Sequence, residues 1–315
     1  MGAVLVRRIL RLIPQLLVLV TIAFALVHLT PGSTGTINVE TGSTQNLDQL
    51  RAQLGLDRPL YVQYGDWLVH VARLDFGVSY VDGRSVIEKI AERLPATLLL
   101  TGTALIVATV LGFLLGILAA VHQNTWVDYS ATLFAFFGLS IPSFWAGLLL
   151  IIVFAVTLRV LPAQGMTSIG GGGPLDVAWH LVLPATILAL EATAAISRYV
   201  RSSMVETLDE DFIRTARAKG LPERKVIMRH AVRNALLPTV TILGLRLPVL
   251  VGGALLIETV FAWPGIGRLG YEAVTQRDYP VILGLLIFTG TLTIVGNLLA
   301  DITYAFVDPR VKLEG

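Results

Sequence analysis

The stretch Asp209–Pro238, DEDFIRTARAKGLPERKVIMRHAVRNALLP, decides how the rest of this chain is interpreted. It is a long, strongly basic run inside an otherwise apolar sequence, and its acidic residues lie mainly at its start. Its basic residues are Arg214, Arg217, Lys219, Arg224, Lys225, Arg229 and Arg233. A polar segment of this kind between hydrophobic runs is typical of a cytoplasmic loop of a membrane protein, and we expect it to contact another protein.

The composition excludes a water-soluble protein. Of the 315 residues, 54% are hydrophobic and 15% are charged, whereas soluble domains carry about 25% charged residues. The chain has no cysteine, which excludes disulfides, thiolate metal sites and a cysteine nucleophile. A net charge of +2 could suggest nucleic-acid binding, but the basic residues lie next to apolar spans, as membrane orientation requires. We therefore predict a protein of the lipid bilayer that binds no nucleic acid.

Six apolar segments predict an all-α membrane protein with six transmembrane helices, because about 20 apolar residues cross a ~30 Å hydrocarbon core. They cover residues 9–29, 97–121, 131–158, 179–200, 235–257 and 281–305. The first is too long for the apolar core of a signal peptide and is predicted to be an uncleaved anchor. Gly112 and Gly116 fit a close helix contact, and Pro142 predicts a kink in the third segment.

These spans divide the chain into three parts. Residues 1–30 form the N-terminus and first helix, 31–95 an external segment, and 96–315 a five-helix core that contains the basic loop at 201–237. Nine basic residues lie between Arg198 and Arg233, three accompany the start of the first span and two follow the last; the external segment has six, against eight acids. The basic loop and both termini are therefore predicted to be cytoplasmic.

The basic loop carries start and stop signals for two short helices. The acids at 209–211 favour a helix start, Gly220 is placed to end that helix, and Pro222 begins a second helix that runs to Leu237. An apolar knob on the first helix is expected to fit a groove in a cytosolic partner; the alternative is an ordinary positively charged loop without a partner. The knob consists of Phe212, Ile213 and Ala216.

The loop resembles the EAA loop of bacterial ABC importer permeases, in which Glu-Ala-Ala is followed by three residues, a glycine and a later Leu-Pro. Arg214-Thr215-Ala216 stands in the Glu-Ala-Ala positions, Gly220 is the glycine and Leu237-Pro238 closes the motif. The missing glutamate and the later Leu-Pro are similar to the dipeptide/oligopeptide/nickel permeases. The likeness covers nearly the whole chain and includes Leu54-Gly-Leu-Asp-Arg-Pro59, Gln63-Tyr64, Leu94-Pro-Ala-Thr97, Ser140-Ile-Pro-Ser143, Glu258-Thr-Val-Phe-Ala-Trp-Pro-Gly-Ile-Gly267 and Asp308-Pro-Arg310.

The resemblance is to the first, B-type, permease of such systems and implies the type I ABC importer permease fold in a bacterial inner membrane. The departures are Ser33-Thr34, where the family often has Asp-Pro, and Arg246, where many relatives have an uncharged residue. It implies a second, C-type permease, two ATPase subunits that use ATP and Mg²⁺, and an external substrate-binding protein. Di- or oligopeptides are the implied substrates, with nickel, glutathione or sugars as the alternatives.

This division of labour implies that the loop transmits the motion of the ATPases. The residues expected to couple are Glu210, Phe212, Ile213, Arg214, Ala216, Arg217, Lys219, Gly220 and Pro222. The sequence has no Gly-x-x-x-x-Gly-Lys-Ser/Thr phosphate loop, so we expect no enzyme activity and no cofactor on this chain. The five histidines lack metal-ligand spacing, and the GxGxxG match at 265–270 lacks a surrounding βαβ unit.

Four polar residues in or near the spans are candidates for the translocation pathway: Arg246, Glu258, Glu191 and Asn297. Arg246 lies about ten residues, or ~15 Å, into the fifth span, and an arginine at that depth costs at least ~2.5 kcal/mol unless it faces a pore or a partner. We expect it to meet a peptide carboxylate; the alternative is a buried pair with Glu191 or with the sister permease. Glu258 is expected near the external gate.

Two other classes of protein fit less well. An intramembrane protease would need a nucleophile or metal motif such as Gly-x-Ser-x-Gly or His-Glu-x-x-His, and neither is present. A proton-coupled carrier could use Glu191 and Arg246 as a relay, but it would need inverted repeats, and it would leave the basic loop unexplained.

Overall fold

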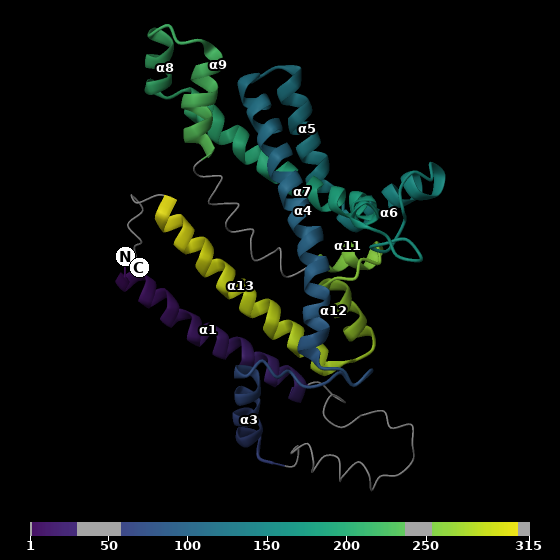
Figure 1. Ribbon diagram of the computed structural model, residues 1–315. Helices are drawn as coiled ribbons and strands as arrows, with labels where there is room; N and C mark the ends of the chain where they lie inside the picture. Colours follow the sequence, from purple (N-terminus) through teal and green to yellow (C-terminus); the bar gives the residue numbers. More distant parts are fainter. Residues whose placement is uncertain (1, 30–57, 237–253, 308–315) are drawn as a thin grey trace.

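The computed structural model describes residues 2–29, 58–236 and 254–307. Within these ranges the chain is helical, and the only β-pairing is one isolated antiparallel bridge between Val78 and Ser85. The elements, labelled in Figure 1, are α1 (Gly2–Leu29), α3 (Leu60–Ala72), α4 (Val86–Val121), α5 (Trp126–Ser140), α6 (Ser143–Leu150), the π-helix η1 (Ile151–Thr157), α7 (Pro174–Leu208), α8 (Asp211–Ala218), α9 (Glu223–Lys225), the π-helix η2 (Val226–Ala231), α11 (Leu255–Val260), α12 (Ile266–Thr275) and α13 (Tyr279–Val307).

Three helices in the described ranges are long and apolar enough to cross a membrane, namely α4, α7 and the Tyr279–Leu298 part of α13. In α1 the residues Leu12–Leu26 form an apolar helical stretch. An all-α membrane protein is thus confirmed, whereas the six-span count stays a prediction, because much of the fifth segment lies outside the described residues. Helix α4 begins at Val86, well before the predicted boundary at residue 96, so the predicted external segment shares a helix with the core.

The third predicted span is broken. Helix α5 ends at Ser140, α6 starts at Ser143, and α5 meets the α6–η1 pair at 101°. Pro142 is the N-cap of α6 with φ −58°, which suits a helix start, and its ring disfavours helical geometry at Ile141. The disruption predicted from this proline is confirmed, but it is a sharp turn between two helices rather than a kink within one.

Helices α4 and α7 form the centre of the bundle and pack closely (Figure 1). A Cβ placed on Gly116 would lie 2.7 Å from the backbone oxygen of Ser197, and one on Gly112 would lie 2.7 Å from Cγ2 of Ile196. Real side chains do not approach this closely, so glycine is what allows the two backbones to meet. The close contact predicted from these two glycines is confirmed.

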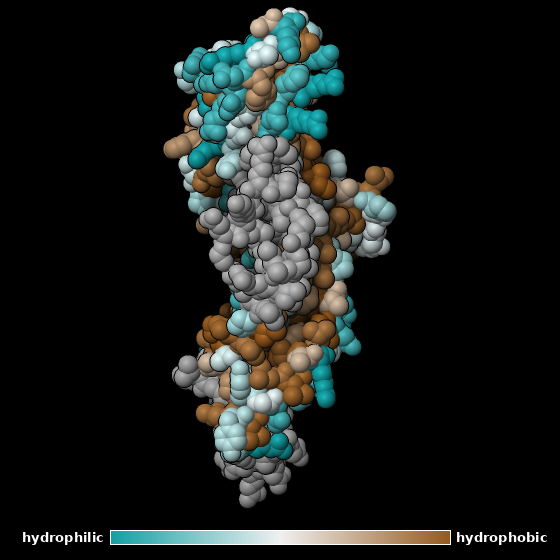
Figure 2. Space-filling model, turned by 90° about the vertical axis from the view of Figure 1, so that its left-hand side faces the viewer, coloured by the Kyte–Doolittle hydropathy of each residue, from teal (hydrophilic) through white to brown (hydrophobic). Residues whose placement is uncertain are grey.

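Two hydrophobic clusters lie toward opposite ends of the molecule. One joins α7 to α8 and η2 and contains Met204, Ile213 and Val226, each fully buried. The other joins α1, the start of α4, α12 and α13 and includes Ile90 and Val281. Figure 1 shows α8 and α9 at one end and α3 at the other, and Figure 2 shows hydrophilic side chains gathered over the α8–α9 end, above a largely hydrophobic body.

Candidate functional site

The basic loop folds into a compact unit, called here the hook and defined as residues 209–236. Its first helix, α8, is preceded by the N-cap Glu210 in extended conformation and has Asp211 in its first turn and Arg217 in its last. These charges complement the helix dipole at both ends. The second helical part runs from α9 through η2 to residue 236. The predicted pair of short helices is therefore present, although the end of the second, predicted at Leu237, lies at the limit of the described residues.

The corner of the hook is formed by residues 219–222. Gly220 has φ +74°, a left-handed conformation that only glycine adopts at little cost, which explains why α8 ends there. Pro222 is the N-cap of α9. Across the corner, Arg217 Nη2 donates to Glu223 Oε1 at 2.8 Å. This bond raises the pKa of the Arg217 guanidinium and lowers that of the Glu223 carboxyl, so both groups are charged at neutral pH.

The two faces of α8 have different environments. Ile213 and Ala216 are 0% and 6% exposed and pack within the chain's own cluster against α7 and η2. Phe212 is 41% exposed, and Arg214 and Lys219 are exposed as well. This corrects the expected knob: Ile213 and Ala216 fasten α8 to its own chain, and of the three apolar residues only Phe212 is available to a partner.

The hook is attached to the long helix α7. Met204 and Val200 of α7 are fully buried in the same cluster as Ile213, and Ser203 Oγ donates to the backbone oxygen of Ala235 at 2.8 Å. Burying a side chain of the size of Ile213 stabilises by about 1.5–3 kcal/mol. Side chains of α8 and α7 therefore belong to one hydrophobic cluster, which η2 shares.

Helix α5 is fixed to α7 by an ion pair that sequence analysis did not predict. Arg201 donates to Asp128 from Nε at 2.5 Å and from Nη2 at 2.7 Å, and Asp128 is 2% exposed. Asp128 also accepts from the backbone N–H of Asn124 at 3.0 Å. A bidentate arginine–carboxylate pair fixes orientation as well as distance. An isolated acid among apolar residues was the one available sign of this contact.

Glu258 lies toward the end of the bundle opposite the hook, where it makes hydrogen bonds within the protein. It is fully buried; its Oε1 accepts from Thr97 Oγ1 at 2.9 Å and its Oε2 from the backbone N–H of Arg268 at 3.0 Å. Thr97 Oγ1 in turn accepts from the backbone N–H of Ile266 at 2.7 Å. Carboxyl and hydroxyl together cap the N-terminus of α12, where unpaired N–H groups favour negative charge.

This arrangement, called here the clasp, consists of Thr97, Glu258, Trp263, Ile266 and Arg268. Trp263 is fully buried, and its Nε1 donates to the backbone oxygen of Ala96 at 2.8 Å. The clasp joins α4 to the α11–α12 turn through two of the sequence motifs quoted above, 94–97 and 258–267. As a fully enclosed carboxyl, Glu258 lines no open pathway in this conformation, and its proposed role as a gate residue needs the clasp to separate.

The remaining pathway candidates differ in what the structure says of them. Glu191 lies in the middle of α7 and is exposed, and Asn297 on α13 is exposed as well. No hydrogen bond or ion pair joins Glu191, Glu258 and Asn297 to one another within the described ranges. Arg246 lies outside the described residues, so its expected position in the pathway stays a prediction.

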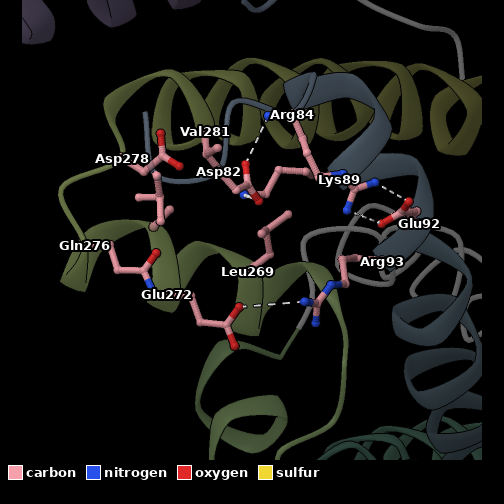
Figure 3. Close-up of a pocket in the computed structure, with 12 residues that line it drawn as sticks. Asp82, Arg84, Lys89, Glu92, Arg93, Leu269, Glu272, Gln276, Asp278 and Val281 are labelled. Atoms are coloured by element: carbon pink, nitrogen blue, oxygen red, sulfur yellow. Dashed lines mark hydrogen bonds and ion pairs between the residues drawn. The ribbon is translucent and has the colours of Figure 1, made fainter. Parts of the chain in front are cut away.

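A polar pocket of about 260 Å³ lies at the end opposite the hook, between the start of α4 and α12. Figure 3 shows Glu272 of α12 facing Arg93 of α4 across it; their charged atoms are 3.8 Å apart. Lys89 Nζ donates to Asp82 Oδ2 at 2.8 Å, and this bond is the main reason that the pKa of Asp82 falls to about 2. Of these two pairs, Arg93–Glu272 joins α4 to α12, whereas Lys89–Asp82 joins α4 to the segment that precedes it.

No group of three or more metal-ligating side chains occurs in the part of the chain that the structure describes.

Comparison with known proteins gives consistent results along the whole sequence. Residues 112–313 match the family described as binding-protein-dependent transport system inner membrane component, and residues 1–101 match the N-terminal part of such membrane components. An oligopeptide transport system permease protein of Bacillus subtilis is 42% identical over 315 residues, which are 99% of this chain and 100% of that protein. A glutathione transport system permease protein of Salmonella choleraesuis is 40% identical and covers 98% of both chains.

Solved structures show the same fold. A chain of the MetNI methionine ABC transporter in inward-facing conformations superposes with a TM-score of 0.54 at 19% identity, covering 70% of this chain and 97% of that one. A chain of an amino acid ABC transporter gives a TM-score of 0.50 at 16% identity, with coverages of 70% and 94%.

Proposed function

Because this chain belongs to the family of binding-protein-dependent transport system inner membrane components, we propose that it is the permease subunit of an ATP-driven ABC importer of di- or oligopeptides. The peptide assignment is supported by the 42% identical oligopeptide permease of Bacillus subtilis. In this proposal the chain forms the translocation pathway with a second permease, two ATPase subunits use ATP and Mg²⁺, and an external binding protein delivers the peptide. The chain itself has no ATPase site.

The hook is the observation that carries this proposal. Its outer face carries the exposed Phe212 and the exposed basic residues Arg214 and Lys219, whereas Ile213 on its inner face is buried in a cluster with residues of α7. Helix α8 thus has one face open to a partner and the other packed in a cluster with a transmembrane helix. This arrangement is suited to pass a movement of the partner on to the spans. With the hook on the cytoplasmic side, where the charge distribution puts it, that partner is the ATPase, and both termini lie on the same side.

The candidates for the translocation pathway are assigned within the same arrangement of the chain in the membrane. Glu191 and Asn297 are exposed on helices that would cross the bilayer, and polar residues in such positions normally face a pore or a partner. Arg246 is proposed as a third pathway residue on sequence grounds alone. Glu258 would act at the external gate by releasing the clasp.

Gly220→Val tests the coupling role of the hook. A β-branched residue at φ +74° is strongly disfavoured, so the corner should change shape while the spans insert normally. In proteoliposomes containing the whole complex, we expect ATP-driven peptide uptake to fall at least about tenfold. Ala218→Val, an exposed helical position two residues away, is the control and should transport normally. Wild-type uptake by Gly220→Val would contradict the coupling role.

The same preparation separates the alternative substrates and the alternative mechanism. Glutathione is supported by the 40% identical glutathione permease, and competition between glutathione and peptides for uptake distinguishes the substrates; nickel and sugars would be identified in the same way. A proton-coupled carrier would respond to an uncoupler rather than to ATP depletion. Transport by this chain alone, without partner subunits, would exclude the ABC assignment.

A further inference from the structure

The second half of helix α7 has an exposed stripe that its packing leaves uncovered. The positions Glu191, Ala195, Arg198 and Ser202 follow one another at spacings of four, three and four residues, so they lie on one face of the helix. Glu191, Arg198 and Ser202 are exposed and Ala195 is half-buried, whereas other faces of α7 pack against α4, α5 and η2.

The charges on this stripe are incompatible with lipid. Glu191 lies 17 residues from each end of α7, a helix that qualifies as a membrane span, so it is roughly 25 Å from either end. Neither Glu191 nor Arg198 makes a hydrogen bond or ion pair with another described side chain. Ionisable groups inside a span face a bundle interior or a water-filled space, because hydrocarbon excludes them.

A groove continues the stripe between α7 and α5. It has a volume of about 880 Å³ and is lined by Ala195, Arg198, Tyr199 and Ser202 of α7 and by uncharged residues of α5, including Phe136. Of the two other charges in the lining, Arg201 pairs with Asp128, and Glu206 is an exposed carboxylate with one long contact, 3.5 Å, from the hydroxyl of Ser202. Volumes of this size are typical of sites for small organic ligands, and Arg198 is the cation left free to meet one.

We propose that this stripe and the α5–α7 groove form a wall of the solute path in the half of the span next to the hook, with Arg198 receiving a peptide's carboxylate and Glu191 its amino group. The two residues are seven positions apart, or ~10.5 Å along the helix. Three residues of extended peptide span at most about 10–11 Å. This assignment rests on the proposed peptide importer and adds to it a two-point contact for short zwitterionic peptides.

A second protein helix fits the stripe less well than water and solute do. Where α4 meets α7, Gly112 and Gly116 bring the backbones together, as close contacts between membrane helices require. The stripe instead carries the long side chains of Glu191 and Arg198, which allow no such close approach of backbones.

The absence of cysteine from the sequence allows a direct test by single-cysteine labelling of the assembled complex in nanodiscs, where both membrane faces are accessible. We expect Ala195→Cys and Ser202→Cys to react with charged methanethiosulfonates. Leu133→Cys, on the apolar surface of α5, and Ala194→Cys, at a fully buried position, should react at least about tenfold more slowly. If Ala195→Cys and Ser202→Cys are as unreactive as these controls, the stripe is sealed by protein and the proposal is wrong.

The charge of the reagent tests the two named side chains. Ala195 lies four residues after Glu191 and three before Arg198, so each charge acts on it from a neighbouring turn. On the Ala195→Cys background, Arg198→Gln should lower the ratio of anionic to cationic labelling rates about three- to tenfold, and Glu191→Gln should raise it by a similar factor. Unchanged ratios in both variants would overturn the assignment, and this readout requires no transported substrate.

Peptide specificity has its own measurement. During ATP-driven turnover with a tripeptide and the binding protein, labelling of Ala195→Cys should slow relative to turnover with ATP and the binding protein alone. Equal rates in a complex that transports the tripeptide would overturn the assignment of Arg198 and Glu191 to peptide ends. A complex that transports no peptide would instead refute the proposed function, and the labelling results would still decide whether the stripe faces water.

Discussion

The clasp offers the sharpest test of how the end of the bundle opposite the hook is held together. In Thr97→Val the side chain keeps its shape but loses a hydroxyl that both donates to Glu258 and accepts from the backbone N–H of Ile266. Both partners are buried. Leaving a buried polar group unpaired costs about 1–3 kcal/mol, so losing contacts to two such groups should cost about 2–6 kcal/mol of unfolding free energy.

The loss can be followed by the thermal unfolding of the purified complex. Trp263, one of the five tryptophans of the chain, is fully buried and bonded to Ala96 within the clasp, so it contributes to the fluorescence change. At roughly 2–4 °C per kcal/mol, the thermal midpoint of the purified complex should fall by about 4–24 °C. Thr109→Val is the matched control on the same helix, because its hydroxyl donates to Leu105 of α4 itself. A midpoint for Thr97→Val no lower than that of Thr109→Val would refute the clasp as a stabilising contact.

Three further predictions concern packing, the hook and pH. Gly116→Val should destabilise the α4–α7 contact by about 1–3 kcal/mol, whereas Gly102→Val, with open space around it, should not; equal thermal midpoints would contradict this. Ile213→Ala should lower stability by about 2–5 kcal/mol, while Phe212→Ala should leave the midpoint unchanged and weaken ATPase binding; the reverse pattern would show that the faces of α8 are misassigned. The pKa of Asp82 is depressed to about 2, so the stability that its carboxylate contributes is present above about pH 4 and is lost as the pH falls through 2. The difference in thermal midpoint between wild type and Asp82→Asn should therefore stay constant from pH 5 to 8 and shrink in acid.

The structure changes the interpretation of two residues that the sequence marked as functional. Glu258 is a cap for α12 rather than an open pathway residue, and Ile213 is an anchor of the hook rather than part of its docking surface. In both cases the neighbours in space decide the environment: Glu258 accepts from Thr97 and from the backbone of Arg268, and Ile213 is buried in the cluster with Met204.

Local features of the sequence determined the helical membrane fold, the break at Pro142, the α4–α7 contact at Gly116 and the corner at Gly220. Each depends on a property of one segment: unbroken apolarity, a ring that excludes helical geometry at the preceding residue, a missing side chain, or a left-handed backbone. These properties act over a few residues, so they can be recognised without knowing the neighbours in space.

Only the tertiary structure decided which side of α8 is buried, that Asp128 pairs with Arg201, and that Thr97 meets Glu258 across 161 positions of sequence. Such pairs leave no periodic trace, because each partner is a single polar residue in an apolar helix. The energy of a buried polar group depends on whether a partner is within hydrogen-bond distance. That distance is set by how the helices pack, so it cannot be predicted from the order of residues along one helix.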